Sequence, residues 1–349
     1  MVKSYLFETD EHRALREQVR RFAAAAIAPH AHAWEEANEF PRELYQQSAE
    51  AGFLTCVGLG SHGIALPPIV KFGTDAQKER YVRPTLTGEK VSALGITEPG
   101  GGSDVAAVQT KAIRDGDHYV VNGAKTFITS GTRADFVTTA VRTGGEGHGG
   151  ISMLIIDSAT PGFTVAGKLK KTGWWASDTA ELAFEDCRVP VGNLIGQEGA
   201  GFLMIMTNFV TERLMIAGQC VAIAELAYRE SVEYAKQRHA FGKSLSGFQV
   251  IRHKLADMAT QIAAARALTG ECVTRYLQGE QTPSLAAMAK NTATDMCSHV
   301  CDQAVQIHGG YGYMREYVVE RLYRDARLYP IGGGTREIMN EIISKVEGY

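Results

Sequence analysis

The sequence has no long apolar run and no excess of charge of one sign, and these two absences exclude whole classes of protein. No apolar stretch reaches the roughly 20 residues that a membrane-spanning helix needs, so we expect no stable membrane insertion. Lysine and arginine total 36 against 39 acidic residues, a net charge of −3, which argues against nucleic-acid binding. The first residues resemble neither a secretory signal nor a transit peptide. We therefore expect a cytoplasmic protein, or a mature protein of an organelle matrix.

Cysteine is also scarce in this chain of 349 residues. Its six cysteines are scattered, which favours buried free thiols in a reducing compartment over a disulfide framework. Cys297 and Cys301 would share one helix face near His299 and His308, but no CxxC pair or zinc knuckle accompanies them. We therefore expect core cysteines and no metal. The six are Cys56, Cys187, Cys220, Cys272, Cys297 and Cys301.

The glycine-rich stretch Gly100–Gly102 lacks the features of the common nucleotide-binding loops. No Gly-Lys-Ser/Thr follows it, Val105 replaces the third glycine of a dinucleotide fingerprint, and a strand pattern follows where that fingerprint needs a helix. Two interpretations remain open. The stretch is either a tight polar loop, or a surface where a flat or phosphorylated ligand approaches the backbone, flanked by the hydroxyls of Thr97, Ser103 and Thr129.

What the chain does contain is a helical, then β, then helical order, which predicts an α+β fold. Residues 1–91 read as a helical domain, 92–195 as an antiparallel β domain and 196–349 as a helical bundle. The β block alternates short runs of β-branched and aromatic residues with turns. Asp115-Gly116 and Asn122-Gly123 are dipeptides typical of hairpin turns.

Helix signals frame that β block on both sides. Before it, Thr74 and Gln77 have the spacing of a capping box. After it, the nearly all-round apolar segment 201–238 predicts a long helix inside a bundle. A second long helix is expected over 251–277, and a third after the Thr-Pro pair at 282–283.

Several separated segments resemble signatures of the acyl-CoA dehydrogenase family. They are ITEPGGGSD (96–104), NGAKTFITSG (122–131), KTGWWASDTAELAFEDCRVP (171–190), QRHAFGKSLSGFQ (237–249) and QIHGGYGYMREYVVERLYRDARLYPIGGGTREI (306–338). They appear in family order over nearly the whole chain. The resemblance implies an N-terminal helical domain, a β-barrel-like middle domain and a C-terminal four-helix bundle.

The same resemblance implies a reaction and its partners. FAD would accept a hydride from Cβ of an acyl-CoA thioester while a base removes the Cα proton, giving the trans-2-enoyl-CoA. Electrons would pass to electron-transfer flavoprotein, and the protein would be a homotetramer or, less often, a dimer. Two alternatives stay open: a flavin oxidase or monooxygenase of the same fold, and a non-catalytic acyl-CoA-binding scaffold.

The base has two positions in the family, and only one is filled here. Most members carry it as Glu-Gly-Thr in the last glycine-rich turn, where this chain has Gly333. Long-chain and isovaleryl members carry it on the first long C-terminal helix before an arginine, which matches Glu212 and Arg213. The resemblance implies Glu212 as the base and the Gly333 amide as a donor to the thioester oxygen. Without it, Glu212 would be interpreted as a surface carboxylate.

The resemblance also implies ligand contacts. Arg213 would lie near the CoA adenosine, and Gly332, Gly333 and Ser103 would contact substrate. The flavin would lie between Leu94, Ile96, Thr97 and Ser103 on one side and Phe127 and Thr129 on the other. A second subunit would supply Arg238, Phe241, Gln249, Gln306 and Gly310, with Thr335 and Glu337 near the adenine or ribose.

The segment from Phe53 to Ile64 departs from the family pattern. Members normally carry a Pro-Glu-x-x-Gly-Gly loop and a further helix there, and this chain runs almost directly from Leu54 to Val57. That helix normally walls the acyl pocket. Acyl-chain length and branching therefore stay open.

Overall fold

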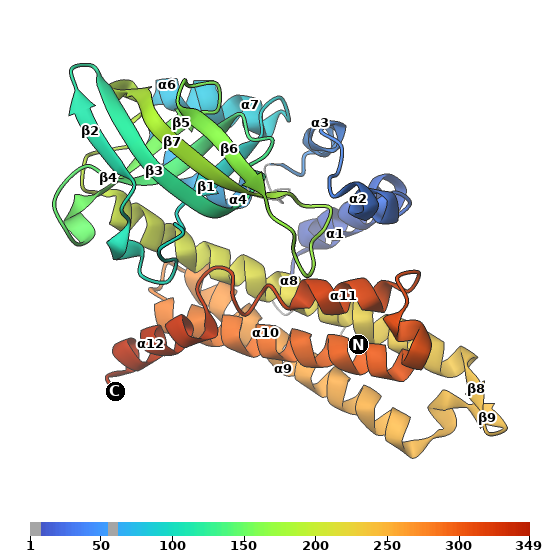
Figure 1. Ribbon diagram of the computed structural model, residues 1–349. Coiled ribbons are helices and arrows are strands. Elements are labelled where there is room, and N and C mark those ends of the chain that lie inside the picture. Colours follow the sequence, from blue (N-terminus) through green and yellow to red (C-terminus); the bar gives the residue numbers. More distant parts are fainter. Residues whose placement is uncertain (1–7, 55–61) are drawn as a thin grey trace. The chain divides into compact units, whose positions relative to one another are not determined.

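The structure is a computed structural model that describes residues 8–54 and 62–349 (Figure 1). Most of the shortened segment between Phe53 and Ile64 lies outside the described residues. The described chain forms two compact units. One comprises Ala14–Asn208, and the other comprises residues 8–13 with Phe209–Tyr349.

Short helices precede the sheet. They are α1 (Asp10–Phe22), which continues as a π-helical turn (Ala23–Ile27), then α2 (Ala31–Ala37), α3 (Glu43–Glu50), α4 (His62–Ala65), α5 (Pro67–Phe72), α6 (Asp75–Gln77), a π-helical turn (Lys78–Val82) and α7 (Arg83–Leu86). The predicted capping box is confirmed: Thr74 Oγ1 accepts from the Gln77 amide at 3.2 Å, and Gln77 Oε1 accepts from the Thr74 amide at 3.0 Å. This reciprocal pair satisfies two amides that a helix start leaves free.

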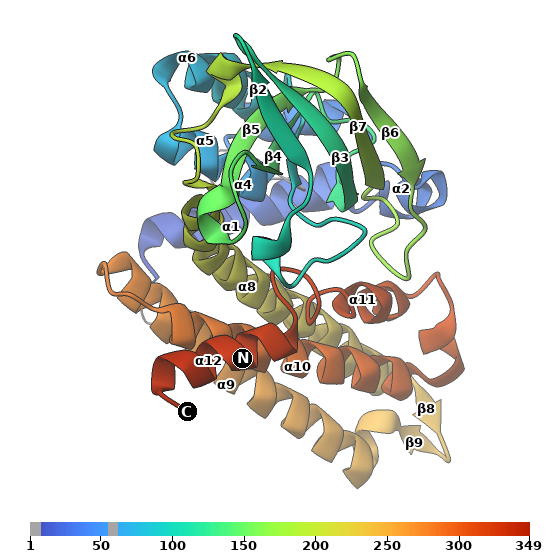
Figure 2. The ribbon, with the colours of Figure 1, turned by 60° about the vertical axis from the view of Figure 1, so that its left-hand side comes forward.

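The β block forms one curled, mixed sheet. Its strands are β1 (Ser92–Gly95), β2 (Lys111–Asp115), β3 (His118–Thr129), β4 (Phe136–Arg142), β5 (Ile151–Asp157), β6 (Phe163–Lys168) and β7 (Thr179–Pro190). The order is β1-β4-β2-β3-β7-β6, with β5 on β4, and Figure 2 shows β2, β3, β7 and β6 side by side. Most pairs are antiparallel as predicted, but β4 pairs in parallel with β1 and β2.

One predicted hairpin is confirmed and the other is wrong. Asp115-Gly116 joins β2 to β3, and Gly116 has a φ of 62°. Asn122-Gly123 instead lies inside β3, where the register with β7 shifts between Val121 and Gly123. The Asn122 side chain donates to Asp186 at 3.1 Å and accepts from its amide at 2.8 Å, so the dipeptide lies opposite a bulge in β7.

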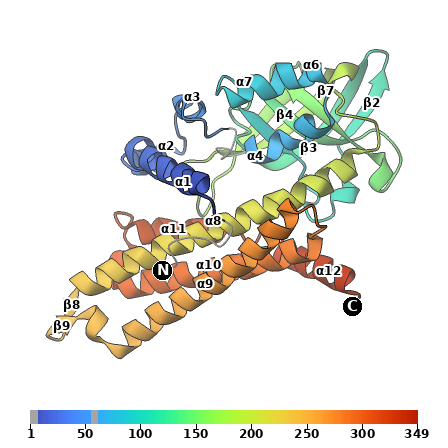
Figure 3. The ribbon, with the colours of Figure 1, turned by 180° about the vertical axis from the view of Figure 1, so that it is seen from behind.

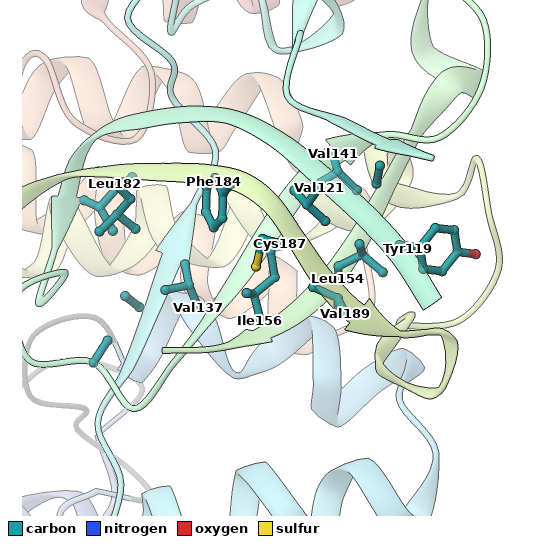
Figure 4. Packing of buried hydrophobic residues seen from close by; sticks show 14 of the residues in the cluster. Tyr119, Val121, Val137, Val141, Leu154, Ile156, Leu182, Phe184, Cys187 and Val189 are labelled. Atoms are coloured by element: carbon teal, nitrogen blue, oxygen red, sulfur yellow. The ribbon is translucent and has the colours of Figure 1, made fainter. Parts of the chain in front are cut away.

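The sheet encloses its own core, because alternate side chains along each strand point to one face. Figure 4 shows Val121, Val137, Ile156, Leu182 and Phe184 meeting there, all of them buried. Cys187 belongs to this cluster. The five described cysteines are buried and free, as expected.

The second unit consists of long helices. They are α8 (Gly201–Gln237, from Phe209 on in this unit), α9 (Gln249–Leu277), α10 (Pro283–His308), α11 (Val318–Ala326) and α12 (Arg336–Glu347). Strands β8 (His239–Ala240) and β9 (Lys243–Ser244) form a small hairpin between α8 and α9. Figure 3 shows α8, α9 and α10 running alongside one another.

Helix α10 is the central element of this unit, since it packs against α9, α11 and α12. Alanine occurs repeatedly along its buried face, which lets neighbouring helices approach closely. Leu214, Cys272, Ala286 and Ala289 join α8, α9 and α10 in one apolar cluster. Among the described residues no helix combines the length and apolarity needed to span a membrane.

Candidate active site

The turn before α12 brings Gly333 directly against Glu212 of α8. A Cβ placed on Gly333 would lie 3.5 Å from Glu212 Oε1 and 2.7 Å from Ile216 Cδ1. The carboxyl of Glu212 therefore occupies the region that a side chain at 333 would enter. The two positions where the sequence predicted alternative bases are thus neighbours in space.

Glu212 is in an unfavourable place for a charge. Its Oε2 atom is buried and has no hydrogen-bond partner among the described residues. Burial raises the pKa of Glu212 to about 7, although the positive charges of Arg213 and Lys290 act in the opposite direction. An uncompensated buried carboxyl oxygen is costly, so its presence indicates a function and argues against a surface carboxylate.

The backbone at Gly333 is held in the left-handed region, with a φ of 66°. Glycine adopts this conformation without the penalty that other residues incur. The Gly333 carbonyl accepts from Arg213 Nε at 3.4 Å. Its amide donates to no acceptor among the described residues, so a polar N–H is left available close to the Glu212 carboxyl.

Lys290 of α10 is the main residue of this cluster that the sequence did not predict. Its side chain is fully buried, and its Nζ donates to the carbonyls of Tyr329 at 3.0 Å and Gly334 at 2.8 Å. Burial lowers the pKa of Lys290 to about 8. The sequence feature that could have pointed to Lys290 is a single basic residue among the mostly small and apolar residues of a predicted helix, SLAAMAKNTATDMC.

Arg213 points into the same cluster. It is buried, its guanidinium lies 5.5 Å from the Phe209 ring centroid, and its Nε contacts the turn through the Gly333 carbonyl. Burial lowers the pKa of Arg213, and Glu212 opposes that shift. A contact of Arg213 with the CoA adenosine stays a prediction.

The other predicted residues near the turn divide between structural and exposed positions. Thr335 caps α12, since its Oγ1 accepts from the Ile338 amide at 3.4 Å. Glu337 is exposed in the first turn of that helix. A Cβ on Gly332 would approach only the Leu328 carbonyl, at 3.8 Å, so space is open there. At Gly333 that space is already filled by Ile216 and Glu212.

In the sheet unit, a buried ion pair fixes the loop that carries Thr97 and the glycines. Lys125 Nζ of β3 donates to Glu98 Oε1 at 2.8 Å and to the Ile96 carbonyl at 3.0 Å. Glu98 also accepts from the amides of Gln109 and Thr110, at 2.7 and 2.9 Å. The Glu98 carboxylate is thus satisfied by several donors, and these lower its pKa despite burial.

The predicted flavin contacts of this unit lie on adjoining segments, β1, its following loop and the end of β3. The Thr126 amide of β3 donates to the Thr97 carbonyl at 2.9 Å, which brings the neighbouring residue Phe127 close to that loop. Phe127 is 68% exposed and has a φ of 59°. Leu94, Ile96, Thr97 and Thr129 are half-buried, and Ser103 is exposed.

In the helical unit, Arg238 and Gly310 line one cavity of about 520 Å³. Tyr234 and His308 stack there with ring centroids 4.2 Å apart; the sequence did not single out Tyr234, and it pointed to His308 only as a neighbour of the cysteines. Phe241 on the adjacent hairpin is 95% exposed, with a φ of 49°. Gln249 and Gln306 are exposed.

Three family models match consecutive parts of the chain. They describe acyl-CoA dehydrogenase N-terminal, middle and C-terminal domains, and they match residues 9–58, 93–187 and 199–347. The long-chain specific acyl-CoA dehydrogenase of Sus scrofa mitochondria is 36% identical over 371 aligned positions, covering 97% of this chain and 86% of the relative. The alignment is longer than this chain of 349 residues, so the relative has positions without a counterpart here.

Solved structures agree in fold. A probable acyl-CoA dehydrogenase from Mycobacterium abscessus superposes with a TM-score of 0.95 at 49% identity, covering 97% of this chain and 99% of that chain. An acyl-CoA dehydrogenase from Bacillus anthracis complexed with FAD gives 0.90 at 29% identity, covering 98% of this chain and 67% of that one.

Proposed function

The chain belongs to the acyl-CoA dehydrogenase family, and we propose that Glu212 removes the α-proton of its acyl-CoA substrate while the Gly333 amide donates to the thioester oxygen. One observation carries this proposal. The buried carboxyl of Glu212 lies against a glycine turn, and neither its Oε2 atom nor the Gly333 amide has a hydrogen-bond partner in the described part of the chain. FAD, the cofactor of the family, supplies the acceptor for the hydride that leaves Cβ.

The Glu212 carboxylate and the Gly333 amide act on the two ends of the same enolising unit, the Cα–H bond and the thioester oxygen. As the Cα proton moves to Glu212, negative charge develops on the thioester oxygen, and an N–H aimed at that oxygen stabilises it. The amide of Gly333 needs no side chain for this role. The left-handed backbone conformation of Gly333 sets the direction in which its N–H points.

The raised pKa of Glu212 suits a base that works near neutral pH. A carboxylate of ordinary pKa would be a weak proton acceptor, whereas one near 7 combines greater basicity with a substantial deprotonated fraction. We therefore expect flavin reduction to accelerate as the pH rises through about 7, since only the deprotonated form accepts the proton.

The sheet unit fits a flat ligand such as the flavin ring. The buried ion pair of Glu98 and Lys125 fixes the loop that carries Thr97, so the Thr97 hydroxyl sits on a rigid backbone. Phe127 presents an exposed ring in a backbone conformation that is unfavourable for a bulky residue. We infer that Leu94, Ile96, Thr97, Ser103, Phe127 and Thr129 hold the flavin.

The substitution Glu212→Gln tests the base. We expect the folded, FAD-loaded variant to be reduced by acyl-CoA about 10²- to 10⁴-fold more slowly under anaerobic conditions. Glu233→Gln is the matched control, because Glu233 lies on the same helix, exposed and 3.0 Å from Lys236. Reduction of the Glu212→Gln protein at the wild-type rate would refute the proposal.

We also propose that electrons leave through electron-transfer flavoprotein, as the family resemblance implies. The test compares anaerobic bleaching of the flavin by acyl-CoA with oxygen uptake in air. Fast bleaching with little oxygen uptake, and reoxidation on adding electron-transfer flavoprotein, would support this acceptor. Rapid oxygen uptake would instead identify an oxidase or monooxygenase.

We propose that the substrate carries a long or branched acyl group, because the structure leaves space beside Gly332. A panel of straight and branched acyl-CoAs, scored by the rate of flavin bleaching, ranks the substrates. Gly332→Val should lower the rate with the preferred branched or long substrate more than with a short one. An unchanged ranking would exclude Gly332 as a pocket residue.

A further inference from the structure

We propose that Lys290 is a positioning residue for the reaction, because its two hydrogen bonds hold the turn that carries the Gly333 amide, and its side chain and the Glu212 carboxyl both lie against that turn. This inference rests on the proposed function of Glu212 and Gly333. It assigns a role to a residue that does not itself touch substrate.

The hydrogen bonds of Lys290 reach the turn on both sides of Gly333, the residue whose amide must be held in place. Its Nζ donates to Tyr329 and Gly334, on either side of Gly333 in the chain. Its Cε would lie 3.7 Å from a Cβ at Gly333, so the lysine stem packs against the turn itself. Both carbonyls point at a residue of the central helix α10.

A glycine-rich turn needs such an anchor. Three consecutive glycines, Gly332–Gly334, impose few backbone limits, and an unanchored turn would spread the Gly333 N–H over many directions. Hydrogen bonds from a charged donor are stronger than those between neutral groups. Arg213 adds a third contact, to the Gly333 carbonyl at 3.4 Å, so two cations hold the backbone and leave the amide free.

The charge of Lys290 acts on the base as well. The titratable groups that act on Lys290 come from α8: Arg213, Cys220 and Glu212. On α11, the negative charge of Asp325 raises the pKa of Tyr329. On α12, Arg336 forms an ion pair with Asp295. The positive charge of Lys290 favours the carboxylate form of Glu212, so removing that charge should make the carboxyl harder to deprotonate.

The test replaces Lys290 by methionine in the full FAD-loaded chain, which keeps a long apolar stem and removes the ammonium. Lys254→Met is the matched control, since Lys254 donates to Gln303 on the same pair of helices, α9 and α10, away from the turn. The probe is whichever acyl-CoA of the panel reduces the wild-type flavin fastest. The rate of reduction is measured from pH 6 to 9 for each protein.

We expect Lys290→Met to reduce about 10- to 100-fold more slowly at pH 7 and to shift the midpoint of its pH profile upward by about one unit. Lys254→Met should stay within about twofold of the wild type. A second readout is the 3-thia analogue of the same acyl-CoA, in which sulfur replaces Cβ, so that the α-proton can leave but no hydride can follow. Its enolate absorption with the flavin should weaken in Lys290→Met and stay at the wild-type level in Lys254→Met.

If the pH profile of Lys290→Met has the wild-type midpoint, the proposed role of Lys290 is overturned, even if the rate of flavin reduction falls. A purely structural defect would lower the rate without moving that midpoint. If that variant fails to retain FAD, Lys290→Arg keeps the charge and donors, and should restore both the rate and the midpoint to near wild type. An FAD-loaded Lys290→Arg protein that is reduced no faster than Glu212→Gln overturns the proposal too. A wild-type rate in Glu212→Gln would instead refute the base assignment.

Discussion

At the scale of single residues, the role that we propose for Glu212 comes with an energetic cost. Its Oε2 is buried without a partner in residues 8–54 and 62–349, and the charges of Arg213 and Lys290 favour its ionisation. Enzymes often keep such groups in their active sites at the expense of stability. Activity and stability should therefore change in opposite directions when the charge is removed.

The first prediction concerns the stability of Glu212→Gln as a function of pH. The folded protein keeps the Glu212 proton up to about pH 7, whereas the unfolded chain releases it near 4.5. Stability of the wild type therefore falls as the pH rises through this window, and glutamine does not titrate. The variant should melt a few degrees above the wild type at pH 8, with a smaller difference at pH 5.5. Circular dichroism melts of both proteins and of Glu233→Gln check this; a pH-independent difference would contradict it.

A second prediction concerns moving the base to position 333. A Cβ there would lie 2.7 Å from Ile216 Cδ1, so Gly333→Glu in the Glu212→Gln background should be destabilised and inactive. Shortening Ile216 to alanine as well should create the necessary space and restore part of the flavin reduction. The left-handed φ of Gly333 limits the recovery to about one-tenth of the wild-type rate or less. Recovery without the Ile216 change would show that the turn moves freely.

These residues also show where sequence reasoning stops. The family resemblance predicts Glu212 as the base, because glycine stands at 333 and a glutamate precedes Arg213, and this assignment stays a proposal. Lys290 was not predicted, since its partners are backbone carbonyls about 40 residues further along the chain, and carbonyls carry no sequence signature. The filled space beside Gly333 likewise depends on the Ile216 rotamer.

At the scale of elements, the sequence predicts the start of a helix or strand where the residues that form it are close together in the chain. Asp115-Gly116 and the Thr74–Gln77 box are of this kind. Asn122-Gly123 predicts a hairpin because the dipeptide favours one, but the pairing of β3 with β7 and the Asp186 contacts hold it inside β3, opposite a bulge of β7. The short helices α2 and α11 were not predicted, although the buried residues of α11, Val319, Leu322 and Ala326, do lie at helical spacing.

The end of β3 yields a third prediction. Phe127 is exposed and has a positive φ, so its side chain contributes little to the stability of the protein without FAD. Phe127→Gly should relieve about 1 kcal/mol of backbone strain, which offsets the flexibility of glycine. We expect an unchanged melting temperature without FAD, and FAD affinity lowered at least about tenfold, measured by fluorescence titration.

The matched control for Phe127 is Ile113→Ala on β2, because Ile113 is 65% exposed on the same sheet. This control should leave FAD affinity unchanged. Wild-type affinity in Phe127→Gly would remove Phe127 from the cofactor site. A large loss of stability without FAD would mean that the ring packs in the free protein.

At the scale of the whole molecule, the hairpin β8–β9 is hard to explain within one chain. Phe241 is 95% exposed at a positive φ, beside a cavity lined by Arg238 and Gly310. A bulky apolar side chain in a strained and exposed position is typical of a surface that another molecule covers. We infer that Arg238 and Phe241 of one subunit contact the FAD of another, as the family resemblance implies.

The last prediction is complementation between two inactive proteins. Arg238→Ala/Phe241→Ala should lose FAD, and Glu212→Gln should bind FAD but not be reduced. In a mixed pair, the double variant keeps its own Glu212 and receives intact Arg238 and Phe241 from its neighbour, so one site per pair becomes complete. Random reassembly places half of the subunits in mixed pairs, so about one quarter of wild-type activity should return after co-expression or refolding together. Contacts within a single chain would leave every mixed site defective, and no activity would return.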